Sequence, residues 1–438
     1  MHNDPRQTLS YSPMSRLQIV AVAITIGLNA LDGFDVLAIS FASPGIASEW
    51  GIDRGALGIV LSMELLGMAV GSMFLGGVAD RFGRRPTILG CLIVMASGMF
   101  MVTSVKGIYD LSMWRVVTGL GIGGMLAAIT AAAAEYSNAK RRDLCVSLTA
   151  IGYPIGAVVG GSIAAHLLKQ HDWRIVFQFG AIITATFIPL VYFFVPESVS
   201  WLCQKQPGGA IEKINRTMKR FGHGAVQALP DVANEIRRRS FTDILKPGLL
   251  PVTVLVTLAY FLHITTFYFI LKWVPKIVVD MGFAASSAAG ILVWANVGGA
   301  TGGAVFGLLT QRFSLKPLTI FVLLMSTVMV VLFGRGQADL HELALICAVA
   351  GFFTNAGVVG IYAILAKAFP THVRASGTGF AIGAGRGGSV LAPIAAGFLF
   401  QAGYSLQIVA SVMGAGSLIA AFALLLLRLH PEREVAAS

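Results

Sequence analysis

The sequence contains 438 residues, of which 56% are hydrophobic and only 12% are charged, and its formal net charge is +11. A soluble protein has about a quarter of its residues charged, so this composition excludes an ordinary soluble enzyme or binding domain. Long uncharged apolar segments recur along the chain. In lipid, each of them must satisfy its own backbone hydrogen bonds, which a helix does. We therefore predict an all-α membrane protein.

Six apolar segments in the first part of the chain predict six membrane-spanning helices, at about 17–42, 55–79, 87–105, 109–134, 143–168 and 174–195. After a polar stretch, six further segments lie at about 249–275, 284–309, 317–334, 341–366, 374–400 and 404–428. The first helix has no small-residue cleavage site after it, so we expect it to be retained and not removed as a signal peptide. We predict an N-terminal six-helix bundle at 1–195, a cytoplasmic linker at 196–247 and a C-terminal six-helix bundle at 248–438.

The distribution of lysine and arginine indicates the orientation of the helices. With the N-terminus inside, 23 of the 32 basic residues fall on the inner side, and Arg115 and Arg386 fall inside helices. The remaining seven fall in outer loops: Arg54, Lys106, Lys169, Arg174, Lys272, Lys276 and Arg335. This bias predicts that both termini are cytoplasmic. It also explains the basic charge without a nucleic-acid partner. The four cysteines show no metal-ligand spacing, so we expect neither a metal nor a cofactor.

The two halves of the chain are related in sequence. The segment Asp80–Pro86 (DRFGRRP) recurs 231 residues later as Gln311–Pro317 (QRFSLKP), and the same offset takes Gly71 to Gly302. Two related six-helix halves in parallel orientation are typical of secondary transporters, in which the solute site lies near the membrane midplane. The repeat therefore predicts a transporter.

The loop between the second and third predicted helices, Gly76–Arg85, has the composition of a conformational switch. An aspartate there can pair with arginine or cap a helix end, and glycines permit a tight turn. Breaking such pairs as the halves move would bias the conformational equilibrium. The alternative is a loop that only supplies positive charge for topology. Glu135 ends the fourth helix, and we expect it to join a salt-bridge network near the basic residues 140–142. The predicted switch residues are Gly76, Asp80, Arg81, Gly83, Arg84, Arg85, Glu135, Arg142 and Arg374.

Two carboxylates, Asp32 and Asp35, lie in the first predicted helix. Each acid near the bilayer midplane costs about 2.5–3.5 kcal/mol on insertion scales, so the pair indicates a wet cavity or chemistry. Their spacing places both on one helix face, with Asn29 one turn earlier. We predict that Asp32 and Asp35 couple transport to protons and that Asn29 belongs to the substrate site. The alternative is that an aspartate only neutralises a structural partner such as an arginine.

Two arginines inside helices supply the complementary charge. Arginine stays protonated even when it is buried, so each is paired with an acid or binds an anion. Arg386 lies in a glycine-rich helix, and its planar guanidinium matches a carboxylate in a bidentate manner. We therefore predict Arg386 as the main ligand of an anionic substrate. Arg115, near the outer end of the fourth helix, is either a second substrate ligand or one partner of a structural ion pair.

Further candidates carry weaker signals. His263 lies 231 residues after Asp32, where it would relay protons or bind the substrate; helix packing is the alternative. Glu64 is a third acid within a predicted helix. Aromatic side chains can stack on an aromatic substrate, although packing against lipid or core is their commoner role. The candidates of this kind are Phe34, Tyr153, Trp294 and Tyr362.

Several of these segments are similar to those of a known superfamily. The loop Gly76–Arg85 resembles the signature loop of the major facilitator superfamily, and Arg115–Gly124 (RVVTGLGIGG) resembles an element of its fourth helix. Pro196–Ser198 resembles the element that ends the sixth helix in solute-porter families. The resemblance implies the major facilitator fold, with two six-helix bundles.

A second resemblance is narrower. The segment Leu31–Val36 (LDGFDV), together with Arg115 and Arg386, closely resembles the aromatic acid:proton symporter family. It implies that the paired aspartates and the arginine matter for uptake. It also implies that the chain imports a small organic anion, such as a benzoate or hydroxybenzoate, with protons by alternating access. The expected setting is the bacterial inner membrane, where the chain would act as a monomer whose partners are the organic acid, protons and lipid.

Two alternatives stay open at this point. A sugar or polyol porter of the same superfamily shares several elements, but the segment Leu258–His263 (LAYFLH) lacks the paired glutamines of sugar porters. A sensor that binds a solute without transporting it would be expected to carry a signalling domain, for which the linker and tail leave little room. No nucleophile–base or metal-ligand pattern appears, so we expect that the protein is not an enzyme.

Overall fold

The computed structural model describes residues 4–229, 246–336, 339–369 and 373–427, apart from the side chains at 76 and 374–376. Within these ranges, twelve helices are long and apolar enough to cross a membrane. The prediction of an all-α fold with twelve candidate membrane-spanning helices is therefore confirmed for the described residues. The cytoplasmic location of both termini stays a prediction.

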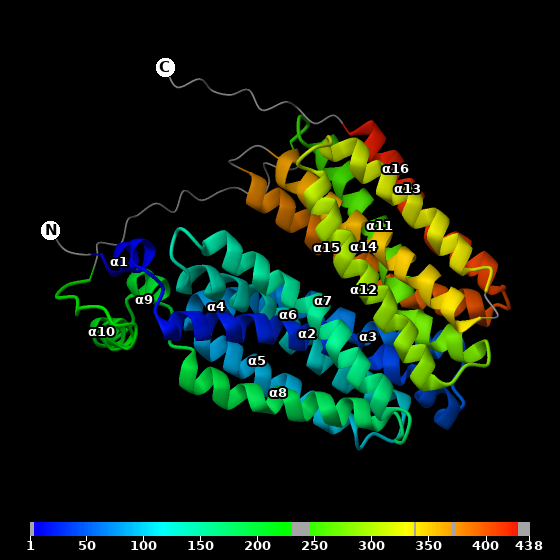
Figure 1. The fold of residues 1–438 in the computed structure, drawn as a ribbon, viewed down its shortest axis with the longest axis horizontal. Coiled ribbons are helices and arrows are strands. Elements are labelled where there is room, and N and C mark those ends of the chain that lie inside the picture. Colours follow the sequence, from blue (N-terminus) through cyan, green and yellow to red (C-terminus); the bar gives the residue numbers. More distant parts are fainter. Residues whose placement is uncertain (1–3, 230–245, 337–338, 370–372, 428–438) are drawn as a thin grey trace. The chain divides into compact units, whose positions relative to one another are not determined.

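The chain divides into two compact units (Figure 1). The first contains Met1–Ile236 and Pro275–Val293, and the second contains Arg237–Val274 and Trp294–Ser438. The segment Pro275–Val293, expected in the C-terminal bundle, thus groups with the first unit. The bundle boundaries at 195 and 248 stay predictions.

The first unit carries six membrane-spanning segments. They are α2 (Arg16–Trp50), α3 with α4 (Arg54–Phe74 and Gly76–Phe82), α5 (Arg84–Val102), α6 (Ile108–Tyr136), α7 (Arg142–Leu167) and α8 (Arg174–Phe194). Three short helices gather at the end of the bundle where α2 begins (Figure 1). They are α1 (Pro5–Tyr11), α9 (Val199–Lys205) and α10 (Ala210–Arg220). Because α9 and α10 lie inside the stretch expected as a linker, that stretch contains folded structure.

Local sequence signals explain where α2 begins and ends. The Ser15 hydroxyl accepts from the Gln18 amide, and the Gln18 side chain accepts from the Ser15 amide at 2.8 Å, which forms a capping box. Gly51, with a φ of 59°, ends the helix in the left-handed conformation. Between them α2 continues through Pro44, past the expected end at 42. Membrane helices tolerate proline because neighbouring groups satisfy the freed carbonyl.

Glycines set the closest helix contacts of the first unit. α2 packs against α7, and a Cβ on Gly156 of α7 would lie 1.7 Å from the carbonyl oxygen of Ala30. α3 packs against α6, and a Cβ on Gly71 would lie 2.4 Å from the carbonyl oxygen of Leu120. Small residues allow such close backbone approach, which is a main source of helix association in lipid. The middle of α2 is thereby held directly against α7.

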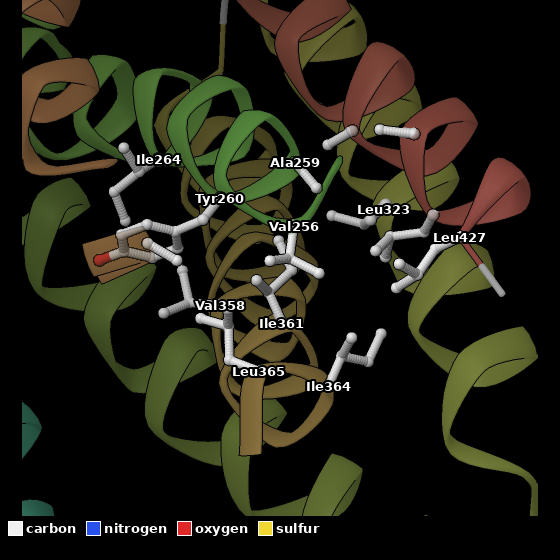
Figure 2. Packing of buried hydrophobic residues seen from close by; sticks show 14 of the residues in the cluster. Val256, Ala259, Tyr260, Ile264, Leu323, Val358, Ile361, Ile364, Leu365 and Leu427 are labelled. Atoms are coloured by element: carbon white, nitrogen blue, oxygen red, sulfur yellow. The ribbon is translucent and has the colours of Figure 1, made fainter. Parts of the chain in front are cut away.

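The remaining helices are α11 (Leu250–Asp280), α12 (Ala285–Leu309), α13 (Leu315–Phe333), α14 (Leu340–Ala368), α15 (Arg374–Gln401) and α16 (Leu406–Leu426). Figure 2 shows the core of the second unit, which contains Val256 and Tyr260 of α11, Leu323 of α13 and Ile361 of α14. These side chains are all buried. The core therefore joins α11 to α13 and α14.

The prediction that Lys272 and Lys276 lie in an outer loop was wrong. α11 continues to Asp280, so both lysines belong to a helix, and the side chain of Lys272 is fully buried. Lys276 pairs with Asp280 one turn later. Such an i, i+4 pair supports the last turn of a helix, and the apolar residues 277–279 carry α11 on to Asp280.

The sequence repeat has a counterpart in the packing. In the second unit, a Cβ on Gly302 of α12 would lie 2.2 Å from the carbonyl oxygen of Phe352 of α14. This contact repeats the one between Gly71 of α3 and Leu120 of α6. In both halves the second membrane-spanning helix thus packs through a glycine against the fourth.

Candidate functional site

The two acids of α2 lie inside the first unit. Asp35 is fully buried, Asp32 is 2% exposed and Asn29 is 4% exposed. Within the described ranges, neither carboxylate oxygen of Asp32 has a hydrogen-bond partner, and Oδ1 of Asn29 has none either. The amide nitrogen of Asn29 donates to the Thr149 carbonyl of α7 at 2.7 Å. Buried polar atoms without partners are costly, and such positions are typical of residues with a role beyond packing.

Arg115 of α6 is the buried cation beside these acids. It is fully buried and forms an ion pair with Glu64 of α3, which is also fully buried. Its guanidinium donates to the backbone carbonyl of Asp35 at 3.0 Å and lies 3.3 Å from the Met99 sulfur. It also lies 5.2 Å from the centroid of the Phe177 ring. Of the two predicted roles of Arg115, these contacts favour the structural ion pair.

Four residues form what we call the acid cluster: Asp32, Asp35, Glu64 and Arg115. The charges of Asp35 and Glu64 act on Asp32, and the charges of Glu64 and Arg115 act on Asp35. The Thr184 hydroxyl of α8 faces Asp35 and donates to the Gly180 carbonyl at 2.7 Å. Three carboxylates and one guanidinium thus share one buried region, which is an arrangement suited to binding protons.

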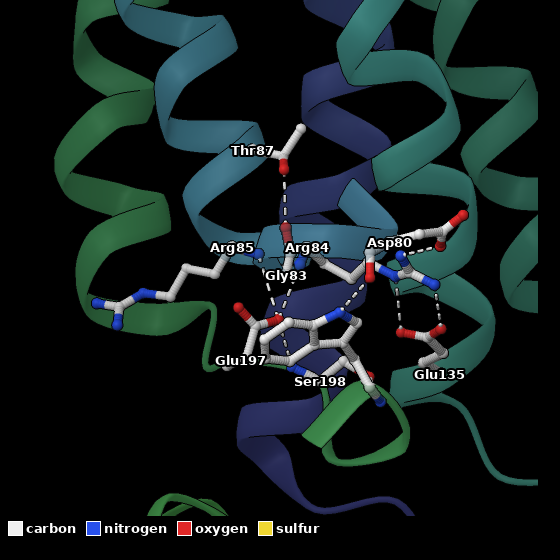
Figure 3. Close-up of polar contacts among 9 residues, drawn as sticks. Asp80, Gly83, Arg84, Arg85, Thr87, Glu135, Glu197 and Ser198 are labelled. Atoms are coloured by element: carbon white, nitrogen blue, oxygen red, sulfur yellow. Dashed lines mark hydrogen bonds and ion pairs between the residues drawn. The ribbon is translucent and has the colours of Figure 1, made fainter. Parts of the chain in front are cut away.

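A second polar group lies near the end of the bundle that carries α9 (Figure 3). Arg84 donates to Asp80 at 2.6 Å and to Glu135 at 3.1 Å. Glu135 thus joins a salt-bridge network as predicted, and its partner there is Arg84. Arg84 begins α5, which packs alongside α6 and so places its guanidinium beside the last turn of that helix.

Glu197 joins this group through backbone contacts. Its carboxylate accepts the N–H groups of Arg84 and Ser198, each at 2.9 Å (Figure 3). Burial raises the pKa of Glu197, although the hydrogen bonds from the backbone oppose that shift. Gly83 has a φ of 110°, and a Cβ there would lie 2.2 Å from a Glu197 oxygen. Glycine is therefore required at 83 both for its conformation and for space. We call Asp80, Arg84, Glu135 and Glu197 the loop network.

Of the other predicted switch residues, Arg85 meets the loop network only through its backbone N–H, which donates to Glu197 at 3.4 Å. Arg81 is exposed, and Arg85 lies 5.0 Å from the centroid of an aromatic ring of α8. Arg142 begins α7 and is exposed, while Gly76 begins α4. Arg374 begins α15, and its side chain lies outside the described part of the chain. Their roles in a switch stay predictions.

Arg386 lies on α15 in the second unit and is half-buried. Its charge acts on Tyr260 of α11, whose hydroxyl is 3.0 Å from that of Tyr362 on α14. Gly385 leaves room for the tyrosine, because a Cβ at that position would lie 1.9 Å from the Tyr260 ring. The two tyrosines therefore meet each other, and Tyr260 packs on α15 at the residue next to Arg386.

His263 occupies a different environment from that of its repeat partner Asp32. It is fully buried, and its two ring nitrogens lie 2.8 Å from the Thr354 carbonyl and 2.8 Å from the Ser417 hydroxyl. These contacts join α11 to α14 and α16, as expected of a helix-packing histidine. A role in proton relay or substrate binding stays a prediction.

The predicted aromatic contacts are spread over both units. Phe34 is buried, its ring centroid is 5.2 Å from that of Phe179, and it fills the space above Gly160. Tyr153 is half-buried, and Trp294 is 54% exposed. The contacts of Phe34 are those of a core residue. Tyr362 is the one of the four whose hydroxyl meets that of Tyr260. Substrate stacking by any of them stays a prediction.

Two residues with candidate roles and one fully buried lysine were missed by sequence reasoning. Lys272 was assigned to a loop because it lies near the end of an apolar run. Tyr260 appeared only in a segment considered for its lack of glutamines. Glu197 lay in the Pro196–Ser198 element, which was recognised as a family feature but given no contact. In each case the missing information was which helices pack together.

Comparison with known proteins gives full-length relatives. The chain is 26% identical to the gallate transporter of Pseudomonas putida, over 96% of this chain and 94% of that protein. It is 26% identical to a 4-hydroxybenzoate transporter of Pseudomonas putida, over 92% and 91%. It is 27% identical to the 3-(3-hydroxy-phenyl)propionate transporter of Escherichia coli K12, over 94% and 95%. These names confirm the predicted resemblance to aromatic acid transporters and the prediction that the chain is not an enzyme.

Solved structures support the fold. The inward-open xylose transporter of Escherichia coli matches with a TM-score of 0.74 and 18% identity, over 95% of this chain and 97% of that one. A model of the Major Facilitator Superfamily matches residues 25–334 and 256–438. The signature loop, the helix count and these matches agree, and the chain belongs to the major facilitator superfamily.

Proposed function

We propose that the chain imports a small organic anion together with protons, and that the anion is an aromatic carboxylate such as benzoate or hydroxybenzoate. The observation that carries the proposal is the acid cluster, which keeps three carboxylates buried inside membrane-spanning helices. The names of the gallate and 4-hydroxybenzoate relatives support the class of substrate. The setting is the bacterial inner membrane, with a monomer whose termini both lie in the cytoplasm.

The acid cluster is the proposed proton site. An ionised carboxylate that is buried without a partner is costly, and Asp32 is in that position within the described residues. Asp32 and Asp35 take up protons when they face the outside and release them when they face the cytoplasm. Transport is then driven by the proton gradient, because the anion moves only with the protonated cluster.

Arg386 is the proposed ligand of the substrate carboxylate. A guanidinium binds a carboxylate through two parallel hydrogen bonds, whereas Nη2 of Arg115 already contacts Glu64 and the Asp35 carbonyl. The hydroxyls of Tyr260 and Tyr362 beside Arg386 suit a hydroxylated aromatic acid. This grouping makes Arg386 a better choice than Arg115.

The loop network is the proposed switch of the alternating-access cycle. It joins the ends of α4, α5 and α6 to the chain after α8 through Asp80, Arg84, Glu135 and Glu197. A network of partly buried charged hydrogen bonds has two discrete states, made or broken. Its formation would therefore favour one conformation of the transporter over the other.

Uptake into proteoliposomes tests the proposal. We expect 4-hydroxybenzoate, benzoate or gallate to accumulate when the outside is acidified, and xylose and glucose not to compete. The double variant Asp32→Asn/Asp35→Asn should lose this accumulation but retain exchange of substrate. Accumulation of a sugar would indicate a sugar porter, and binding without accumulation would indicate a sensor; either result overturns the proposal.

A variant of Arg386 tests its proposed role as the ligand of the substrate carboxylate. Arg386→Lys keeps the charge but loses the bidentate geometry, so we expect the KM for 4-hydroxybenzoate to rise about tenfold or more. Arg312→Lys, an exposed position in the same unit, serves as the matched control and should leave the KM unchanged. An unchanged KM in Arg386→Lys would assign the carboxylate to another residue.

A further inference from the structure

Glu64 places a constraint on the charge of the acid cluster. The charged groups that act on Asp32 and Asp35 come from α2 itself, from Glu64 on α3 and from Arg115 on α6. The neighbours from α5 and α8 are the uncharged Cys91 and Thr184. With all acids ionised, three negative charges would face one positive charge in a fully buried region.

The single guanidinium is committed to Glu64. Arg115 contacts the carboxylate of Glu64 directly, but it reaches Asp35 through the backbone carbonyl, at 3.0 Å. Separating a buried ion pair is strongly unfavourable, because it leaves an uncompensated buried charge. The pair is neutral as a whole. Among the described residues, the carboxylates of Asp32 and Asp35 therefore have no ion-pair partner of their own.

We propose that Glu64 fixes the coupling ratio at two protons for each anion by holding Arg115 away from the two aspartates. This inference rests on the proposed function. When the cluster is buried, Asp32 and Asp35 each carry one proton, and both protons leave when the cluster opens to the cytoplasm. One monovalent anion and two protons enter together, so each cycle moves one net positive charge inward. Glu64 acts through Arg115 and is a positioning residue.

The number of protons that enter with each anion can be measured in two independent ways at equilibrium. With the membrane potential clamped to zero, each pH unit of gradient raises the accumulation ratio about 100-fold for two protons and about 10-fold for one. With no pH gradient, an interior-negative potential of 100 mV raises the ratio about 50-fold for one net positive charge and leaves an electroneutral carrier unchanged. Together they measure protons and charge separately.

The test uses the full chain in proteoliposomes with radiolabelled 4-hydroxybenzoate, and protein-free liposomes give the passive contribution. We expect the wild type to show the two-proton signatures. In Glu64→Gln the guanidinium is released and neutralises one aspartate, so the dependence should fall to about 10-fold for each pH unit, with no response to the potential. The shorter Glu64→Asp keeps the charge and should keep the two-proton signatures.

The matched control is Glu49→Gln, because Glu49 pairs with Arg174 at 2.7 Å between α2 and α8 but does not act on the acid cluster. Glu49→Gln should keep the wild-type ratio of protons to anion.

A wild type that accumulates the acid with one proton overturns the inference while the proposed function stands. A wild type without proton-driven accumulation overturns the proposed function itself. Two-proton signatures in Glu64→Gln also overturn the inference, and if that variant fails to fold, the wild-type ratio decides alone.

Discussion

Glu197 shows how one carboxylate organises a helix start. Besides the N–H groups of Arg84 and Ser198, it accepts that of Arg85 at 3.4 Å. The first N–H groups of a helix have no partner within the helix, and α5 begins at Arg84. Glu197 therefore caps α5 from a distant part of the chain, and the preceding Gly83 must leave space for it.

This carboxylate gives a pH-dependent prediction. Burial raises the pKa of Glu197 above its ordinary value of 4.5. Its contribution to stability is thus fully present below pH 4.5 and is lost as the pH rises through the raised pKa. Glu197→Gln stays neutral, so the Tm of the wild type minus that of the variant should fall as the pH rises. The exposed Glu212→Gln is the control, and a difference that is constant or grows with pH would contradict the assignment.

For single residues, the sequence identified the unusual side chains but not the partners that they contact. Asp32, Asp35 and Arg115 stand out because a charge inside an apolar run is costly in lipid. Their neighbours on other helices follow from packing that no local pattern encodes. Glu64 was therefore recognised as an intramembrane acid, but its pairing with Arg115 was not.

Helix contacts depend on glycine at a few positions. The carbonyl carbon of Ala30 would lie 2.3 Å from a Cβ at Gly156, in addition to the oxygen at 1.7 Å. Backbone atoms cannot move aside as a flexible side chain can. Any larger residue would therefore push α7 away from the part of α2 that precedes Asp32.

We expect Gly156→Ala to lower stability by about 1–3 kcal/mol, the usual cost of overpacking, and to slow uptake by displacing the acid cluster. Gly90→Ala on α5 is the control, because a Cβ there meets nothing within 4 Å. Thermal unfolding in detergent measures both. Equal Tm values for the two variants would show that α2 and α7 are not held at this distance.

The apolar runs in the sequence predicted which membrane-spanning helices exist, but they did not predict the residues at which these helices end. α2 passes through Pro44 and α11 extends to Asp280 because capping and ion pairs, rather than apolar composition, decide where these helices stop. The short helices α9 and α10 were hidden in a polar stretch. α9 is fixed by tertiary contacts such as that of Trp201, whose indole donates to the Asp80 carbonyl at 2.9 Å.

Across the whole molecule, the two halves share a framework but differ in charge. The glycine contacts at Gly71 and Gly302 repeat. The loop network does not, because Gln311 replaces Asp80 and Lys367 stands at the repeat position of Glu135. At these two positions the second unit has a cavity of about 480 Å³, and the cations in its lining include Arg312 and Lys367. Two cations cannot reproduce the acid–arginine pairs of the first unit, so the proposed switch belongs to one half.

This asymmetry yields a prediction about conformational opening. Arg84 and Glu135 are 11% and 19% exposed at their side chains, so their pair is largely shielded from water. A hydrogen bond to a charged group contributes about 1.5–3 kcal/mol. Glu135→Gln should therefore increase hydrogen exchange in the segment 84–87 by roughly 10-fold to 150-fold. Asp80 is 68% exposed, and solvent screening makes the expected effect of Asp80→Asn smaller.

Lys367→Gln is the matched control, because it changes the charge at the repeat-related position of the other half. It should leave exchange in the segment 84–87 unchanged. Uptake of 4-hydroxybenzoate, measured on the same preparations, separates a local effect from a global one. If the loop network acts as the switch, ranking Glu135→Gln, Asp80→Asn and Lys367→Gln by the change in hydrogen exchange will give the same order as ranking them by the change in transport rate. Fast exchange in Glu135→Gln with a wild-type transport rate would leave the network as a structural cap of α5.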